Sequence, residues 1–328
     1  MLRGLKLVYA SIPVRKLREL FPFPRLFPFN SFLKRLVEKN RHSLSWYVLS
    51  KLGLSGSSVV RIDSGGQALL SLNRGSPLGN KNDEIVVPVD KVIYKWILRR
   101  GLWEIKEVNF LRKYISDSRN RNIVFLDFGG HAGLVTRQLL RTVSNQISLA
   151  YIVEPHSRYI EAIEHNCSEW IIDRKLIVIP FALSNVTART SLYIENSNFG
   201  NASLLKVSNV DSTKSHQHPV HTITVGDFEN IIFHKDVKYV LKCDIQGMDA
   251  LVLSKFSHSF WNQVECAVIE VWALNSISEQ DVKKLISLWS NFSFFSWDSE
   301  WKIKASVEEI KKFWLSKSGA TRNLYISV

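Results

Sequence analysis

The sequence is poor in cysteine, in glycine and in long uncharged stretches, and each shortage excludes a class of protein. Its 328 residues contain three cysteines, Cys167, Cys243 and Cys266, which is too few for a disulfide-stapled fold, and their spacing is not that of a metal site. No stretch long enough to cross a bilayer lacks a charged side chain, so we predict no transmembrane helix. The N-terminus has no clean apolar segment with a cleavage site. We therefore expect a protein of the reducing cytoplasm.

Apolar side chains and positive charge are abundant. A hydrophobic content of 45% and an aromatic content of 11% suffice for a real core and exclude wholesale disorder. The formal net charge of +13 suits nucleic acid, an anionic membrane surface or an anionic substrate. Ten of the basic residues lie in residues 1–41, mixed with the phenylalanines and prolines of FPFPRLFPFNSF. This arm is either a peripheral contact with an anionic membrane or a solvated arm that packs some phenylalanines on the main domain.

The rhythm of the chain changes along its length. Residues 1–55 read as helical with proline-rich breaks and include the helix SLSWYVLSKLG, ended by Gly53. Three strand-like runs, SVVRID, QALLSLN and EIVVPV, then predict a small β-meander. We assign residues 1–90 to a helical and β-meander extension and residues 91–328 to the main domain. The main domain alternates strand-like and helical runs, which predicts an α/β fold with a doubly wound, mostly parallel sheet.

Glycines gather after the first strand-like run of the main domain, in FLDFGGHAG (residues 125–133). Asp127 ends the strand, and Gly129, Gly130 and Gly133 follow it. Glycine permits a tight turn and a close approach of a ligand to the backbone, at a place where such sheets bind their ligands. We expect all four residues to belong to a cofactor site, with a plain strand-to-helix turn as the alternative.

The second strand-like run, ISLAYIVEP, ends in Glu154, 27 residues after Asp127. An acidic residue placed in this way can accept both hydroxyls of a ribose, so the ligand is predicted to be a nucleoside derivative. A dinucleotide would bring a pyrophosphate, which Asp127 would repel, whereas a cationic ligand suits this aspartate. We therefore favour S-adenosylmethionine over a dinucleotide. The stretch PFALSN places Ala182 and Ser184 as candidate contacts of the adenine.

Charged residues also end the fourth and fifth strand-like runs, VKYVLKCDI and VECAVIEV. Lys242 and Asp244 are two residues apart and share a face, and Glu270 lies at the neighbouring tip. Burying these charges together is costly unless they pair or meet a substrate. We predict Asp244 as a general base, Lys242 as the group that holds its carboxylate and Glu270 as the reserve base, with a structural ion pair as the alternative. We expect no metal, although Asp244 with Glu270 could hold Mg²⁺.

Taken in order, these motifs resemble the FkbM-type family of S-adenosylmethionine-dependent methyltransferases. The resemblance covers roughly residues 90–280, through DKVIYKWILRRGLWE, DFGGHAG, VEPHSRYIEAIEHN, PFALSN, FGNASL, LKCDIQGMD and VIEV. It implies the class I methyltransferase fold, with a seven-stranded sheet, and methyl transfer to a hydroxyl, most often of a saccharide. By the same resemblance Asp127, Gly129, Gly133 and Glu154 bind the cofactor and Asp244 is the active-site acid. The extension of residues 1–90 would then cap the active site or place the enzyme on its acceptor.

The sequence departs from this family in three places. Gln246 stands where many relatives have glutamate, Met248 and Asp249 replace a small or aromatic residue and a glutamate, and Gly226 falls where an aspartate is expected. Two other functions stay open. One is a nucleic-acid methyltransferase, prompted by the charge, although CDIQG after the fourth strand argues against methylation of base amino groups. The other is a non-catalytic, basic membrane-surface protein with a degenerate pocket. The sequence specifies neither the acceptor nor the oligomeric state.

Overall fold

The computed structural model describes residues 57–328, except residues 65, 74–75, 81, 91, 119–121, 196–197, 206–214, 235 and 275. The helix predicted to end at Gly53 and the basic arm of residues 1–41 lie outside the described residues. In the described part of the chain, no helix is long and apolar enough to cross a membrane.

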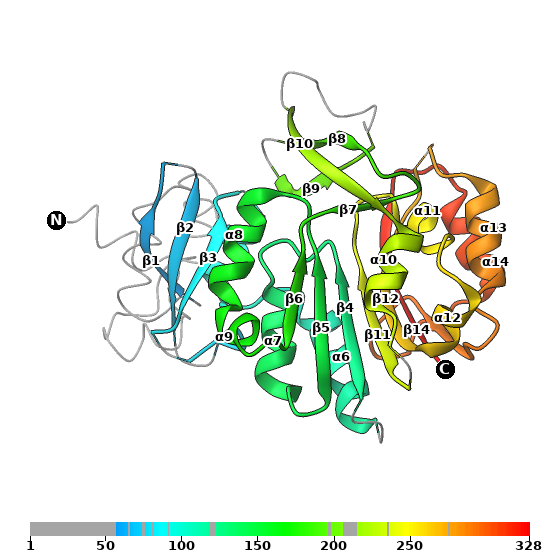
Figure 1. The fold of residues 1–328 in the computed structure, drawn as a ribbon, viewed down its shortest axis with the longest axis horizontal. Coiled ribbons are helices and arrows are strands. Elements are labelled where there is room, and N and C mark those ends of the chain that lie inside the picture. The colour runs from blue at the N-terminus through cyan, green and yellow to red at the C-terminus, as the bar shows by residue number, and fades with distance from the viewer. Residues whose placement is uncertain are drawn as a thin grey trace, which may run out of the picture.

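A seven-stranded sheet forms the centre of the molecule, in the order β13-β14-β12-β11-β4-β5-β6 (Figure 1). Five neighbouring strands pair in parallel, and β14 runs antiparallel to both of its neighbours. The predicted α/β fold with seven strands is present, but the sheet is mixed, because the chain enters β14 from the opposite end. The strands are β4 (Ile123–Phe128), β5 (Ile147–Val153), β6 (Leu176–Ile179), β11 (Lys238–Cys243), β12 (Val264–Trp272), β13 (Phe294–Ser296) and β14 (Thr321–Ser327).

Helices cover both faces of this sheet (Figure 1). Because neighbouring residues of a strand point to opposite faces, Phe125 of β4 joins one apolar cluster and Val124 and Leu126 join the other. The first cluster packs on α6 (Ile105–Asp117), α7 (Leu134–Val143), α8 (Ser157–Asn166) and α9 (Ser168–Ile172). The second packs on α10 (Val225–Ile232), α11 (Asp249–Leu253), α12 (His258–Gln263), α13 (Glu279–Ser287) and α14 (Val307–Trp314).

A second sheet, in the order β7-β10-β8-β9, was not predicted. Its strands are β7 (Ala182–Ser184), β8 (Arg189–Glu195), β9 (Asn198–Ser203) and β10 (Ser215–Thr224). The run KLIVIPFAL, read as one strand, is split at Pro180, which has no N–H to donate: β6 ends before it and β7 pairs with β10 after it. The arrows of β4, β5 and β6 point toward this small sheet, which therefore lies over their carboxyl ends (Figure 1).

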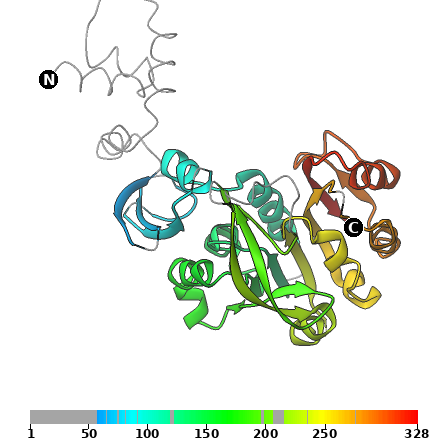
Figure 2. The ribbon, with the colours of Figure 1, turned by 90° about the horizontal axis from the view of Figure 1, so that it is seen from above.

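The predicted β-meander is present as β1 (Ser57–Ile62), β2 (Gln67–Leu72) and β3 (Glu84–Pro88), all antiparallel. It lies on the side of the molecule away from α13 and α14 (Figure 2). Asn166 of α8 joins it to the main domain, since its side chain accepts a hydrogen bond from Val86 N at 2.7 Å and donates one to Val86 O at 2.8 Å. The helix after it, α5 (Ile93–Arg100), ends at Gly101, which has φ of 64°.

Candidate functional site

The glycine turn after β4 lies tightly against the ends of two neighbouring strands. Gly129 has φ of 77°, and a Cβ added to it would lie 1.9 Å from the carbonyl oxygen of Asp244, which follows β11. A Cβ on Gly130 would lie 2.3 Å from Ile152 Cγ2 of β5. Backbone hydrogen bonds from Asp244 N to Phe128 O and from Gly129 N to Val153 O, both of 2.9 Å, close the arrangement. Glycine is required here for contact with the protein itself.

Asp127, at the end of β4, is fully buried. Its Oδ2 accepts a hydrogen bond from Thr136 Oγ1 at 2.7 Å, whereas its Oδ1 has no hydrogen-bond donor. Lys242 pairs with it in register on the next strand, which leaves Oδ1 3.9 Å from the Lys242 Nζ. Burial raises the pKa of Asp127 above its usual value.

A cavity of about 260 Å³ opens at the carboxyl ends of β4, β5, β11 and β12. Among the described residues, three predicted site residues are not in its lining: Asp127 lies behind it, Gly133 packs near Cys167, and the Ser184 hydroxyl bonds to Asn185. The other predicted residues do line the cavity, namely Gly129, Gly130, Glu154, Ala182, Lys242, Asp244 and Glu270. The structure therefore brings together candidates from five separate segments of the chain.

One ammonium group lies within 4 Å of three carboxylates at this cavity. Lys242 Nζ lies 3.5 Å from Glu104 Oε2, 3.6 Å from Asp244 Oδ2 and 3.9 Å from Asp127 Oδ1. Burial alone would lower the pKa of Lys242, but these carboxylates raise that pKa well above its usual value. Burial also raises the pKa of Glu104, to about 7. The cluster is therefore short of positive charge, which suits a cationic ligand.

Gln246 joins the two predicted bases. Its Nε2 donates hydrogen bonds to Asp244 Oδ1 at 2.5 Å and to Glu270 Oε2 at 3.1 Å. Burial, together with the neighbouring Asp244, raises the pKa of Glu270 well above its usual value. An amide N–H donor thus lies between the two carboxyl groups that could have shared Mg²⁺. Within the described ranges, no group of three or more His, Cys, Asp or Glu side chains is placed to hold a metal ion.

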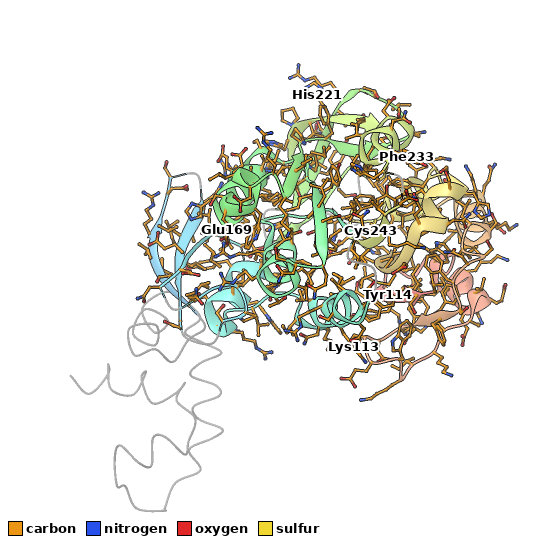
Figure 3. All side chains as sticks on the ribbon, turned by 60° about the horizontal axis from the view of Figure 1, so that its bottom comes forward. Lys113, Tyr114, Glu169, His221, Phe233 and Cys243 are labelled. Carbon is orange, nitrogen blue, oxygen red and sulfur yellow. The ribbon has the colours of Figure 1, made fainter. Side chains whose placement is uncertain are left out.

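Asp249, one of the departures from the family pattern, holds the loop that carries Gln246. Its carboxylate accepts hydrogen bonds from Ile245 N at 3.3 Å, from Gly247 N at 3.1 Å and from Cys243 Sγ at 3.1 Å. Cys243 lies in the interior of the molecule (Figure 3). From the small sheet, Ser203 Oγ donates to Gln246 O at 2.6 Å. The backbone of Gln246, with φ of 52°, is therefore fixed from two sides.

Glu154, after β5, is 5% exposed and keeps acceptor capacity toward the cavity. Its Oε2 accepts a hydrogen bond from His131 N and its Oε1 one from His156 N, each at 2.9 Å. A carboxylate oxygen has two lone pairs, so both oxygens can still accept a hydroxyl. Burial raises the pKa of Glu154 to about 8. Beside it, the His131 ring packs on Tyr159 at 4.2 Å, and burial lowers the pKa of His131 to about 3, so that this ring is neutral.

Reasoning from the sequence missed two residues of this site. Glu104 precedes α6 and was seen only as the last letter of the GLWE lead-in, with no role attached. Gln246 was seen only as a departure from the family pattern. The alternation of Lys242, Asp244 and Gln246 after an apolar strand was the available signal for Gln246, because three alternate residues emerge on one side. Glu104 carries no local pattern of that kind.

No protein-family model matches the chain, and no curated protein matches it. Solved structures similar to it include TrmK of M. capricolum with S-adenosylhomocysteine (10% identity, TM-score 0.32, 67% of this chain and 66% of that chain). Two others are S-adenosylmethionine-dependent methyltransferases. One is from Clostridium acetobutylicum (9% identity, TM-score 0.38, 72% and 96% covered) and one from Agrobacterium tumefaciens (7% identity, TM-score 0.36, 83% and 76% covered). Likenesses of this size leave the function to be inferred from the site.

Proposed function

We propose that this protein is an S-adenosylmethionine-dependent methyltransferase of the FkbM type that methylates a hydroxyl group of a saccharide. The observation that carries the proposal is the cation-poor group of Glu104, Asp127, Asp244 and Lys242 beside the glycine turn. Because a sulfonium ligand brings positive charge, this group is suited to it, whereas it would repel the pyrophosphate of a dinucleotide. The family motifs quoted from the sequence support the same assignment.

The residues present fit the cofactor. Glu154 offers acceptor oxygens for a ribose, and Gly129, Gly130 and Ala182 line the same cavity. When bound, S-adenosylmethionine supplies a methyl group carried on a positively charged sulfur. Carboxylates shielded from water would attract such a charge more strongly than the same groups in solution.

Asp244 is the residue proposed to take the proton of the acceptor hydroxyl. Its side chain lines the cavity, and 23% of its surface is exposed, so an acceptor can reach it. Lys242 and Gln246 hold one oxygen each, which fixes the direction of the carboxylate. Glu270, whose pKa burial raises well above its usual value, is kept as the reserve base.

The acceptor class is tested by transfer of a labelled methyl group. The purified protein is incubated with labelled S-adenosylmethionine in three separate reactions. These contain cell-surface saccharides, lipid-linked saccharides or total RNA as the acceptor. We expect alkali-stable label in a saccharide fraction. Label in RNA instead would favour the nucleic-acid alternative that the charge of +13 prompted, and cofactor binding without transfer to any fraction would favour a non-catalytic protein.

Changing Glu154 to alanine is expected to weaken the binding of S-adenosylhomocysteine by about 1.5–3 kcal/mol, the range of charge-assisted hydrogen bonds. Isothermal titration calorimetry measures this, with NAD as a comparison ligand that wild-type protein should bind much more weakly. Equal affinity in the variant, or a preference for NAD, would contradict the assignment.

The pKa of the Glu154 carboxyl group predicts that the affinity for S-adenosylhomocysteine depends on pH. Its pKa of about 8 means that Glu154 is protonated below that pH in the free protein, and a ribose is accepted best by the ionised form. Affinity for S-adenosylhomocysteine should therefore fall as the pH is lowered from 9 toward 6, by up to about tenfold per unit. Glu154→Gln should lose the part of this slope that centres on pH 8, whereas Glu104, with a pKa of about 7, still titrates below it.

A membrane role for the N-terminal arm remains a prediction from the sequence, and it would place the protein at the cytoplasmic face of a membrane. Each basic side chain near an anionic surface contributes about 1 kcal/mol, so the ten basic residues of 1–41 would give reversible attachment. Full-length protein should sediment with anionic vesicles at low salt and stay in solution with phosphatidylcholine vesicles. A protein lacking residues 1–41 that sediments equally well would contradict this role.

A further inference from the structure

Glu104 differs from the other acidic residues of the cavity in its backbone conformation and in its hydrogen bonding. It stands at the start of α6 with φ of 46° and ψ of 44°, a left-handed conformation that is costly for a residue other than glycine. Its side chain does not cap the helix. It lines the cavity instead, and its Oε2 is buried without a hydrogen-bond partner in the protein. A strained residue that holds an unsatisfied acceptor toward a cavity is a candidate for contact with a ligand.

Lys242 does not satisfy this acceptor. Its Nζ lies 3.5 Å from Glu104 Oε2, beyond the usual length of an N–H···O bond, and is shared with Asp127 and Asp244. What the oxygen lacks is a hydrogen-bond donor. The sulfonium of the proposed cofactor carries charge but no N–H. The α-ammonium of its methionine portion carries both.

The position of Glu104 along the sheet is the one expected for a contact with the methionine portion of the ligand. Glu154, the proposed ribose acceptor, follows β5, whereas Glu104 reaches Lys242 of β11, on the other side of β4. A ligand with its ribose at Glu154 that crosses the glycine turn toward β11 would bring its methionine portion to the Glu104 side. Trp103, the neighbour of Glu104 in the chain, also lines the cavity.

We propose that Glu104 is the binding residue for the α-ammonium group of the cofactor, an inference that rests on the proposed function. The carboxylate gains a donor that the protein does not supply, and the ligand gains a buried anionic partner. The elevated pKa of Glu104, about 7, agrees with a carboxyl group that lacks a full cationic partner before the ligand arrives.

The test compares two ligands that differ only at the methionine end. S-adenosylhomocysteine carries the ammonium and carboxylate groups, and 5′-methylthioadenosine has the same nucleoside and thioether without them. Glu104→Gln should bind S-adenosylhomocysteine about tenfold or more weakly, the scale of one charge-assisted hydrogen bond, and 5′-methylthioadenosine within about twofold of wild type. Decarboxylated S-adenosylhomocysteine, which keeps the ammonium, should lose as much as the parent compound.

Glu107→Gln is the matched control, one turn further along α6. The Glu107 carboxylate accepts hydrogen bonds from Asn323 at 2.7 Å and from Tyr325 at 3.1 Å and is not in the described lining of the cavity, so this change should leave both affinities as they are. An equal loss for both ligands in Glu104→Gln, or no loss for either, would overturn the proposal while the cofactor assignment stands. Wild-type protein that binds neither nucleoside would overturn both.

Discussion

Changing Lys242 to methionine is expected to lower the free energy of unfolding by about 3–5 kcal/mol at pH 8, the usual cost of removing one partner from a buried ion pair. Lys242 is 5% exposed and its Nζ lies within 4 Å of three carboxylates, so its removal leaves them without a compensating charge. Urea denaturation followed by circular dichroism measures the change. Of all single substitutions considered, this one should affect stability most.

The pH dependence of that loss provides an internal check. Without Lys242 the carboxyl groups of Glu104 and Asp127, whose pKa values are already raised by burial, should hold protons to still higher pH. Folding then takes up protons, so the stability of the variant falls as the pH rises, and the deficit should be smaller at pH 5 than at pH 8. A deficit independent of pH would show that only packing was lost.

Lys255→Met is the control for a surface ion pair. Lys255 Nζ lies 2.9 Å from Asp281 Oδ1, but the lysine side chain is 35% exposed, and such pairs contribute about 1 kcal/mol or less. If Lys242→Met costs no more than Lys255→Met, the cavity carboxyls are neutral in the folded protein. The argument for a cationic ligand would then fail.

Changing Asp244 to asparagine is expected to lower methyl transfer by about 10²-fold or more, the scale of general-base removal, while the affinity for S-adenosylhomocysteine stays close to normal. The expectation follows from its place between Lys242 and Gln246 at the edge of the cavity. Transfer of label to the saccharide fraction measures the rate, and calorimetry measures the affinity.

Glu270→Gln is the companion variant for this experiment. Gln246 bonds to both acids, so each substitution disturbs the same bridge, and the comparison isolates the proton-accepting role. Because Asp244 is the proposed base and Glu270 the reserve, Glu270→Gln should retain most of the transfer rate. A reversed result, with transfer surviving in Asp244→Asn and lost in Glu270→Gln, would assign the base to Glu270.

Much of the sheet was predictable because its strands carry their own signal. The inner strands β4, β5, β11 and β12 are buried by helices on both faces, so they read as continuous apolar runs. Polar residues that interrupt such runs at their ends, Lys242 and Asp244 above all, marked the site for the same reason. Of the glycines after β4, Gly129 and Gly130 line the cavity and Gly133 does not, and the tight packing of the first two against β5 and β11 could not be seen in one segment.

The small sheet was missed because its strands lack that signal. β10 reads SHQHPVHTIT, with histidine, serine and a proline, and only Val220 and Thr222 of its second half are buried. The sheet depends on pairing between segments far apart in the sequence, such as Thr222 with Ala182. Glu104 was missed for a related reason. Its role follows from a backbone conformation and from a lysine 138 positions away, neither of which leaves a local pattern.

The contact between Gly129 and Asp244 restricts how this protein can move. The Asp244 carbonyl oxygen lies where a Cβ atom of residue 129 would be. The turn after β4 and the loop after β11 therefore cannot slide past each other without separating. The hydrogen bond from Asp244 N to Phe128 O ties them a second time. A nucleoside that shifts the glycine turn must therefore carry the backbone of the proposed base with it. A displacement at one half of the cavity would therefore reach the other half through main-chain contacts, without any change of side chain.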